Sequence, residues 1–227
     1  MPTHLSALPS PLAVRFDLDG TLVDTVETRI TSWAEILEAF GLRATRDQLG
    51  PLIGVDGRRL AREVAAIHAS PIDDARAEEI DRRAGERYEE LNRSPRALPG
   101  FVGLVAALDA RGVTWAIATS SRKEQVATSV AALGLAREPR IVDGSDVKHA
   151  KPEPDLLLLA AERLGVEPAR CWYVGDSTWD MVAAVAAGMI AIGVTAGAAV
   201  DAATLEDAGA AAVVSGLAEL TEELSRG

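Results

Sequence analysis

Two aspartates, one residue apart, follow an apolar segment near the start of the chain. Asp17 and Asp19 belong to the run Phe-Asp-Leu-Asp-Gly-Thr at residues 16–21, and side chains two positions apart in an extended segment point to the same side. Asp17 can act as a nucleophile that forms an aspartyl phosphate, and Asp19 as the acid and base that serves the leaving oxygen and water. Gly20 lets the backbone approach a phosphate closely. The simpler interpretation is an Asp-rich turn, but a chance match has a frequency on the order of one in a thousand.

Together with three later segments, this run resembles the four motifs of the haloacid dehalogenase superfamily. In the first motif, the first Asp is the nucleophile and the second the acid/base, which the resemblance assigns to Asp17 and Asp19. The second motif is a strand that ends in Ser or Thr, and residues 116–119 match it. The resemblance therefore implies that Thr119 hydrogen-bonds the phosphoryl group. Ser120 follows at the start of the next predicted helix, where free N–H groups suit an anion.

Lys151 and Asp176 match the third and fourth motifs. Lys151 begins a Lys-Pro-Glu-Pro segment, and by resemblance it would balance the charges of the phosphate and of Asp17. Asp176 follows the apolar run at 172–174, so it would lie at the carboxyl end of a strand and bind a metal ion. We expect Asp180 to orient the groups around the metal without binding it. The alternative is a helix N-cap formed by Asp176, with Asp180 favoured by the helix dipole.

The resemblance implies Mg²⁺ as the cofactor. Asp17, Asp176 and the backbone carbonyl of Asp19 would be its protein ligands, and phosphate and water would complete a shell of about six oxygens. Without the ion, the three carboxylates of Asp17, Asp19 and Asp176 would repel a phosphate dianion. Mg²⁺ and Lys151 together carry three positive charges, which would balance the three carboxylates.

The elements that must position these residues form an α/β pattern. Apolar runs alternate with helical patterns, which predicts a doubly wound, Rossmann-like parallel sheet with helices on both faces. Ligands bind at the carboxyl ends of such strands, which is where the aspartates fall. The predicted strands are residues 12–16, 114–119, 140–142, 171–175, 189–194 and 211–214.

One interval lacks strand patterns. Helical spacing and prolines between residues 24 and 96 predict an inserted α-helical cap, over a core made of residues 1–23 and 97–227. Caps of this kind belong to the phosphoglycolate phosphatase and β-phosphoglucomutase-like group, which the chain resembles most. Residues 53–58 resemble the loop that meets substrate in that group, so we expect Arg58 or Arg59 to contact substrate. Solvated charges that open a helix are the alternative.

Composition limits the class of partner. A net charge of −11 and the absence of a Lys/Arg run argue against nucleic-acid binding. No apolar stretch reaches the roughly 18–20 residues that span a membrane, and the first residues lack a signal-peptide pattern. A single cysteine, Cys171, is typical of a reducing compartment. We expect a cytoplasmic protein without a membrane or nucleic-acid partner, and a monomer, with a dimer as the alternative.

These observations predict a Mg²⁺-dependent phosphatase that hydrolyses a small phosphorylated metabolite. The nearest alternative is a sugar phosphomutase on the same scaffold. The β-phosphoglucomutase branch commonly has Val or Ile and a histidine where this chain has Thr21 and Arg29, which favours hydrolysis. Dehalogenation is disfavoured because that branch lacks the second carboxylate, here Asp19. A non-catalytic binding protein is the alternative from another class, and the four complete motifs argue against it.

Overall fold

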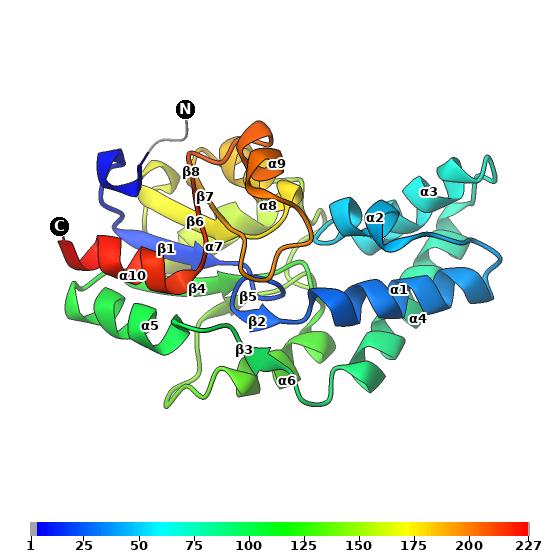
Figure 1. Ribbon diagram of the computed structural model, residues 1–227, viewed down its shortest axis with the longest axis horizontal. Helices are drawn as coiled ribbons and strands as arrows, with labels where there is room; N and C mark the ends of the chain where they lie inside the picture. Colours follow the sequence, from blue (N-terminus) through cyan, green and yellow to red (C-terminus); the bar gives the residue numbers. More distant parts are fainter. Residues whose placement is uncertain (1–3, 227) are drawn as a thin grey trace.

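The core of the protein is a six-stranded sheet whose strands all run parallel (Figure 1). The computed structural model describes residues 4–226. The strand order is β5-β4-β1-β6-β7-β8, and each strand lies within one residue of a predicted one. The strands are β1 (Ala13–Phe16), β4 (Thr114–Ala118), β5 (Ile141–Val142), β6 (Cys171–Gly175), β7 (Ile190–Val194) and β8 (Ala212–Val214).

Helices cover both faces of this sheet. One face packs against α5 (Phe101–Ala110), α6 (Lys123–Ala132) and α10 (Leu217–Arg226), the other against α7 (Asp155–Leu164), α8 (Thr178–Ala186) and α9 (Ala202–Asp207). Alternation along β1 divides its side chains between the faces: Val14 and Phe16 join the first hydrophobic cluster, and Ala13 joins the second. The prediction of a doubly wound α/β fold is confirmed.

A group of helices lies beyond one end of the sheet (Figure 1). This helical group consists of α1 (Val26–Ala39), α2 (Arg46–Leu49), α3 (Gly57–Ile67) and α4 (Asp74–Leu91), with a 3₁₀ turn at Gly50–Leu52. It has its own hydrophobic cluster, which includes Trp33, Leu37, Leu60, Val64 and Ile80. The division of the chain at residues 24 and 96 into core and cap stays a prediction.

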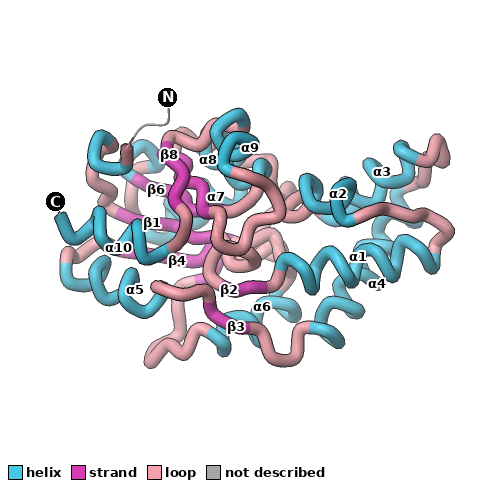
Figure 2. The backbone as a smooth tube through the Cα atoms, in the orientation of Figure 1, coloured by secondary structure: helices cyan, strands magenta, loops and turns pink. Residues whose placement is uncertain are grey.

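Two short strands were missed where the chain passes between the sheet and the helical group. β2 (Val23–Asp24) and β3 (Arg96–Ala97) pair antiparallel, with Val23 opposite Ala97, and Figure 2 shows them side by side. A strand of two residues is too short to show the alternation of apolar and polar residues by which a strand is predicted. The pairing ties the outgoing and returning segments together.

The segment before α7 brings Lys151 to the sheet. Helix α7 begins at Asp155, with Pro154 at its N-cap. Residues 151–154 form turns, and they carry Lys151 towards the end of β1. Between residues 4 and 226, no helix combines the length and apolarity needed to cross a bilayer. The cytoplasmic location and the monomeric state stay predictions.

Candidate active site

A buried lysine occupies the carboxyl end of the central strands. Lys151 Nζ donates to Asp17 Oδ1 at 2.8 Å, to Asp180 Oδ1 at 2.7 Å and to the Tyr173 hydroxyl at 3.3 Å. Asp17 comes directly after β1, and its backbone N–H donates to Val174 of β6. Burial alone would lower the pKa of Lys151, but Asp17 and Asp180 outweigh it and raise that pKa. The ammonium is therefore a fixed positive charge beside Asp17.

Asp180 holds this lysine in place. Its Oδ1 accepts from Lys151 and, at 3.1 Å, from the Tyr173 hydroxyl. Its Oδ2 accepts from the Ser177 backbone N–H at 2.9 Å and from the Ser177 hydroxyl at 2.6 Å. Ser177, and not Asp176, is the N-cap of α8, in a reciprocal capping box with Asp180. Both carboxylate oxygens of Asp180 are thus engaged by donors.

Asp176 lies at the end of β6 against the turn that follows β1. Thr21 donates its hydroxyl to Asp176 Oδ1 at 2.7 Å. Gly20 has φ +82°, and a Cβ there would come within 2.2 Å of Asp176 Oδ2. Only glycine fits this contact and this backbone conformation, so Gly20 makes room for Asp176. A contact between Gly20 and phosphate stays a prediction.

The carboxylates of Asp17, Asp176 and Asp180 gather closely enough to hold a metal ion. Each offers an oxygen, and these oxygens lie within 4.8 Å of one another. Burial raises the pKa of Asp17 to about 7, although Lys151 opposes the shift. Burial and the neighbouring carboxylates also raise the pKa of Asp176. Lys151 alone does not balance this cluster, and a hard cation with oxygen ligands fits it.

Asp19 faces the helical group and is surrounded by donors. Its Oδ1 accepts from the hydroxyls of Thr25 at 2.7 Å and Tyr88 at 2.8 Å. Its Oδ2 accepts from Arg29 Nη2 at 2.8 Å and the Ser121 hydroxyl at 2.6 Å. Burial alone would raise the pKa of Asp19, but Arg29 and the hydroxyl donors outweigh it and lower that pKa to about 2. The carboxylate is fully ionised in this arrangement.

The partners of Asp19 were largely missed by sequence reasoning. Thr25 and Arg29 lie one turn apart at the start of α1, which is a spacing that places two side chains on one face. Tyr88 comes from α4, 69 residues away from Asp19, and no local pattern links it to the site. Arg29 also lies over the Tyr88 ring, 3.5 Å from its centre. The network therefore joins the helical group to the core.

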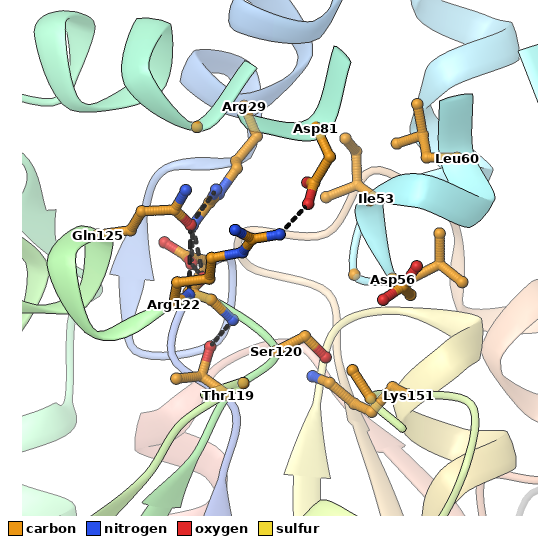
Figure 3. Close-up of a pocket in the computed structure, with 18 of the residues that line it drawn as sticks. Arg29, Ile53, Asp56, Leu60, Asp81, Thr119, Ser120, Arg122, Gln125 and Lys151 are labelled. Atoms are coloured by element: carbon orange, nitrogen blue, oxygen red, sulfur yellow. Dashed lines mark hydrogen bonds and ion pairs between the residues drawn. The ribbon is translucent and has the colours of Figure 1, made fainter. Parts of the chain in front are cut away.

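Thr119 and Ser120 form the turn after β4. Helix α6 begins only at Lys123, so Ser120 precedes the helix and is not part of its first turn. Thr119 Oγ1 accepts from the Ser121 backbone N–H at 3.2 Å. Ser120 Oγ is buried and has no hydrogen-bond partner among residues 4–226. In Figure 3, Thr119, Ser120 and Lys151 lie on the same side of the cavity.

A cavity of about 420 Å³ connects these residues with the helical group. Asp17, Asp19, Thr119, Lys151 and Asp176 line its core side, and Figure 3 shows Arg29, Ile53, Leu60 and Asp81 on the opposite side. Of the two arginines expected to contact substrate, Arg58 lines the cavity. Arg59 is outside the lining and lies over the Trp179 ring, 4.8 Å from its centre.

Known proteins resemble this chain over most of its length. A sequence profile described as haloacid dehalogenase-like hydrolase matches residues 14–194. The probable phosphatase IndB of Dickeya dadantii is 37% identical over 192 residues, which cover 82% of each protein. A phosphoglycolate phosphatase of Xanthomonas campestris is 34% identical over 182 residues, covering 79% of this chain and 80% of that protein. The crystal structure of a hydrolase from Pseudomonas syringae superposes with a TM-score of 0.88 at 33% identity, covering 94% of this chain and 98% of that one.

Proposed function

Because this chain belongs to the haloacid dehalogenase-like hydrolase family, we propose that it is a phosphatase that hydrolyses a small phosphomonoester through an aspartyl phosphate on Asp17. The observation that carries the proposal is the buried Lys151 ammonium 2.8 Å from Asp17 Oδ1, at the edge of a cavity. The names of the relatives from Dickeya and Xanthomonas support phosphoester hydrolysis.

Asp17 and Asp19 would divide the reaction between them. An oxygen of Asp17 attacks phosphorus in line with the bond to the leaving group. That bond breaks and Asp17 carries the phosphoryl group. Asp19, which takes up a proton once Arg29 and Tyr88 no longer donate to it, gives that proton to the leaving oxygen. In the second step, Asp19 takes a proton from a water molecule whose oxygen attacks phosphorus. Inorganic phosphate leaves, and the Asp17 carboxylate is restored.

Three side chains of the core would bind the phosphoryl group. Lys151 supplies a positive charge whose position Asp180 fixes. Ser120 has a buried hydroxyl without a partner among the described residues, which leaves it free to donate to a phosphoryl oxygen. The Thr119 hydroxyl accepts one hydrogen bond and keeps its own proton to donate. Donors held in place before the reaction stabilise charge at little reorganisation cost.

Mg²⁺ fits the carboxylates at the strand ends. Asp17, Asp176 and the backbone carbonyl of Asp19 would hold the ion, since the side-chain oxygens of Asp180 are already engaged by Lys151, Tyr173 and Ser177. When bound, Mg²⁺ would neutralise the carboxylates and attract the negative charge of the phosphoryl oxygens. Asp180 would then act through Lys151, as a positioning residue.

Asp19 must change partners before it can transfer a proton. Its two oxygens accept four hydrogen bonds, two from Arg29 and Tyr88 of the helical group. A displacement of the helical group that is small enough for Arg122 to keep its ion pairs with α4 would release these two donors together. The β2–β3 pairing at the crossing point provides a connection about which such a displacement can occur.

The experiment that tests the function is turnover of a broad panel of phosphate esters with Mg²⁺. We expect release of inorganic phosphate from several small esters by the wild-type protein. The sugar phosphomutase alternative is tested with β-glucose 1-phosphate, Mg²⁺ and a catalytic amount of the bisphosphate. Accumulation of glucose 6-phosphate faster than phosphate release from any ester of the panel would show that the chain is a mutase.

A further inference from the structure

Five charged residues line the cavity between α3, α4 and the segment before α6, and we term this group the distal wall. Asp56 and Arg58 come from the start of α3, Glu78 and Asp81 from α4, and Arg122 from the residue before α6. The distal wall therefore combines the helical group with the core.

Both guanidinium groups of the distal wall are already paired with carboxylates. Arg122 Nη2 lies 2.6 Å from Asp81 Oδ2 and 3.0 Å from Glu78 Oε1. Arg58 lies 2.8 Å from Asp56 Oδ2 and 3.7 Å from Glu78 Oε2. Three carboxylates thus face two guanidinium groups. Figure 3 shows the Arg122–Asp81 pair across the cavity.

The surroundings supply little further positive charge. Arg29, the other arginine of the lining, is paired with Asp19. Lys148 also lines the cavity, but it is exposed on the loop before Lys151, where solvent and salt screen its charge. Burial raises the pKa of Asp81. Even with a proton on Asp81, the carboxylates of Glu78 and Asp56 would match the two guanidinium groups.

The position of Asp81 depends on a glycine. A Cβ on Gly57 would lie 1.9 Å from Asp81 Oδ1 and 3.1 Å from the Trp33 ring. Gly57 is the first residue of α3, and its φ lies outside the left-handed region, so the backbone conformation does not require glycine there. The absence of a side chain at residue 57 instead leaves the space that the Asp81 carboxylate occupies.

This arrangement treats two kinds of leaving group differently. A carboxylate or second phosphate would have to displace Asp81 or Glu78 from Arg122 and would then lie beside those carboxylates, where like charges repel. A hydroxyl group can donate to a carboxylate oxygen and accept from a guanidinium N–H without breaking either ion pair. The distal wall is therefore polar but has no unpaired guanidinium for an anion.

We propose that the substrate is a phosphate ester of an uncharged, hydroxyl-bearing alcohol, such as a polyol or sugar, and that Asp81 and Glu78 exclude anionic leaving groups by neutralising Arg122. The inference rests on the proposed phosphatase function and specifies its substrate class. It assigns Asp81 and Glu78 to specificity, while Asp17 and Lys151 act on the phosphoryl group.

The experiment compares esters matched in size. One pair is glycerol 3-phosphate and 3-phosphoglycerate, and the other is 2-hydroxyethyl phosphate and 2-phosphoglycolate. In each pair, the first ester has a hydroxymethyl group where the second has a carboxylate. In wild-type protein we expect kcat/KM to favour the hydroxyl member of each pair by about tenfold or more, which is about 1.4 kcal/mol. In the double variant Glu78→Gln with Asp81→Asn, Arg122 loses both counter-charges, and the preference should fall by at least about tenfold.

Glu79→Gln is the matched control, because Glu79 lies on the same helix, pairs with Arg82 and is not part of the cavity lining. This variant should keep the wild-type ratio of kcat/KM between the hydroxyl and carboxylate esters. Asp81→Asn alone should give a ratio between those of the wild type and the double variant, and it replaces the double variant in the test if that variant does not fold. Wild-type preference for the carboxylate members, or an unchanged ratio in the variants, would overturn the inference while leaving the phosphatase function intact. No phosphate release from any ester would overturn both.

Discussion

The ammonium of Lys151 lies 2.8 Å from Asp17 Oδ1, although 134 residues separate the two in the chain. Both groups are buried, since the exposed fractions of the Lys151 and Asp17 side chains are 1% and 6%. A buried pair is costly to desolvate and is weak evidence for stability. Its position at the carboxyl ends of β1 and β6, beside a cavity, is better explained by chemistry on an anionic substrate.

Replacing Asp17 by Asn should abolish turnover. The amide has nearly the shape of the carboxylate but no nucleophilic oxygen anion, so we expect kcat to fall by at least about a thousandfold. Phosphate release with a good substrate measures the loss, and far-UV circular dichroism checks that the fold is intact. Asp47→Asn, an exposed substitution on α2, is the control and should keep full activity. Retention of more than about a thousandth of wild-type activity in Asp17→Asn would exclude the covalent mechanism.

Removal of the divalent cation should abolish activity, and Mg²⁺ should restore it. Asp176→Ala removes one proposed ligand, so the Mg²⁺ concentration that gives half-maximal activity should rise by at least about tenfold. Calorimetric titration of substrate-free protein with Mg²⁺ gives a readout that is independent of turnover. Full activity after exhaustive chelation would contradict the proposal.

Gly54→Ala should impair activity more than it impairs stability. Gly54 has φ +94°, and a Cβ there would lie 2.6 Å from Ser177 Oγ, next to Asp176. The loop of the helical group could then no longer sit on the N-cap of α8, and kcat/KM should fall at least about fivefold. Gly41 is a matched control, because it has φ +78° but a Cβ added there would meet no atom within 4 Å.

Gly41→Ala should lose about 1 kcal/mol of unfolding free energy, which is typical of a side chain forced into the left-handed region, and should keep its kcat/KM. Urea denaturation and steady-state kinetics on both variants separate the two effects. Equal losses of kcat/KM in Gly54→Ala and Gly41→Ala would show that contact with Ser177 has no role in activity.

Arg15→Met should stabilise the protein. Arg15 is fully buried in β1, and its Nε and Nη1 atoms have no hydrogen-bond partner among residues 4–226. Burial lowers the pKa of Arg15, and the Cys171 thiol only partly opposes it. Because methionine fills a similar volume without a charge, we expect the unfolding free energy to rise by about 1–3 kcal/mol in urea denaturation. A decrease would indicate that the guanidinium contributes a favourable interaction.

The sheet was predictable because its strands are buried on both faces and appear as continuous apolar runs. Cys171–Gly175, for example, was predicted to the residue. Asp17, Thr119 and Asp176 could be located for the same reason, since each follows directly on such a run. Their convergence then follows from parallel pairing of β1 with β4 and β6.

Contacts between the helical group and the core could not be predicted in this way. Tyr88 and Arg29 reach Asp19 from two different helices, and Asp81 reaches Arg122 across the cavity. In the sequence, these residues are ordinary polar positions of amphipathic helices, and only tertiary packing determines which of them face the site. For the same reason, the sequence did not distinguish Arg58 from Arg59 as the residue that lines the cavity. Adjacent helical residues point about 100° apart, so the orientation of the helix determines which of the two faces the cavity.

The central claim is that the phosphoryl group passes through Asp17. The most direct measurement is a rapid acid quench during turnover of radiolabelled p-nitrophenyl phosphate with Mg²⁺, followed by peptide mapping. Label should appear on the peptide that contains Asp17, form and decay at rates that account for phosphate release, and be absent from Asp17→Asn. Phosphate release at the wild-type rate with no labelled protein at any time, or label on a different residue, would contradict the account.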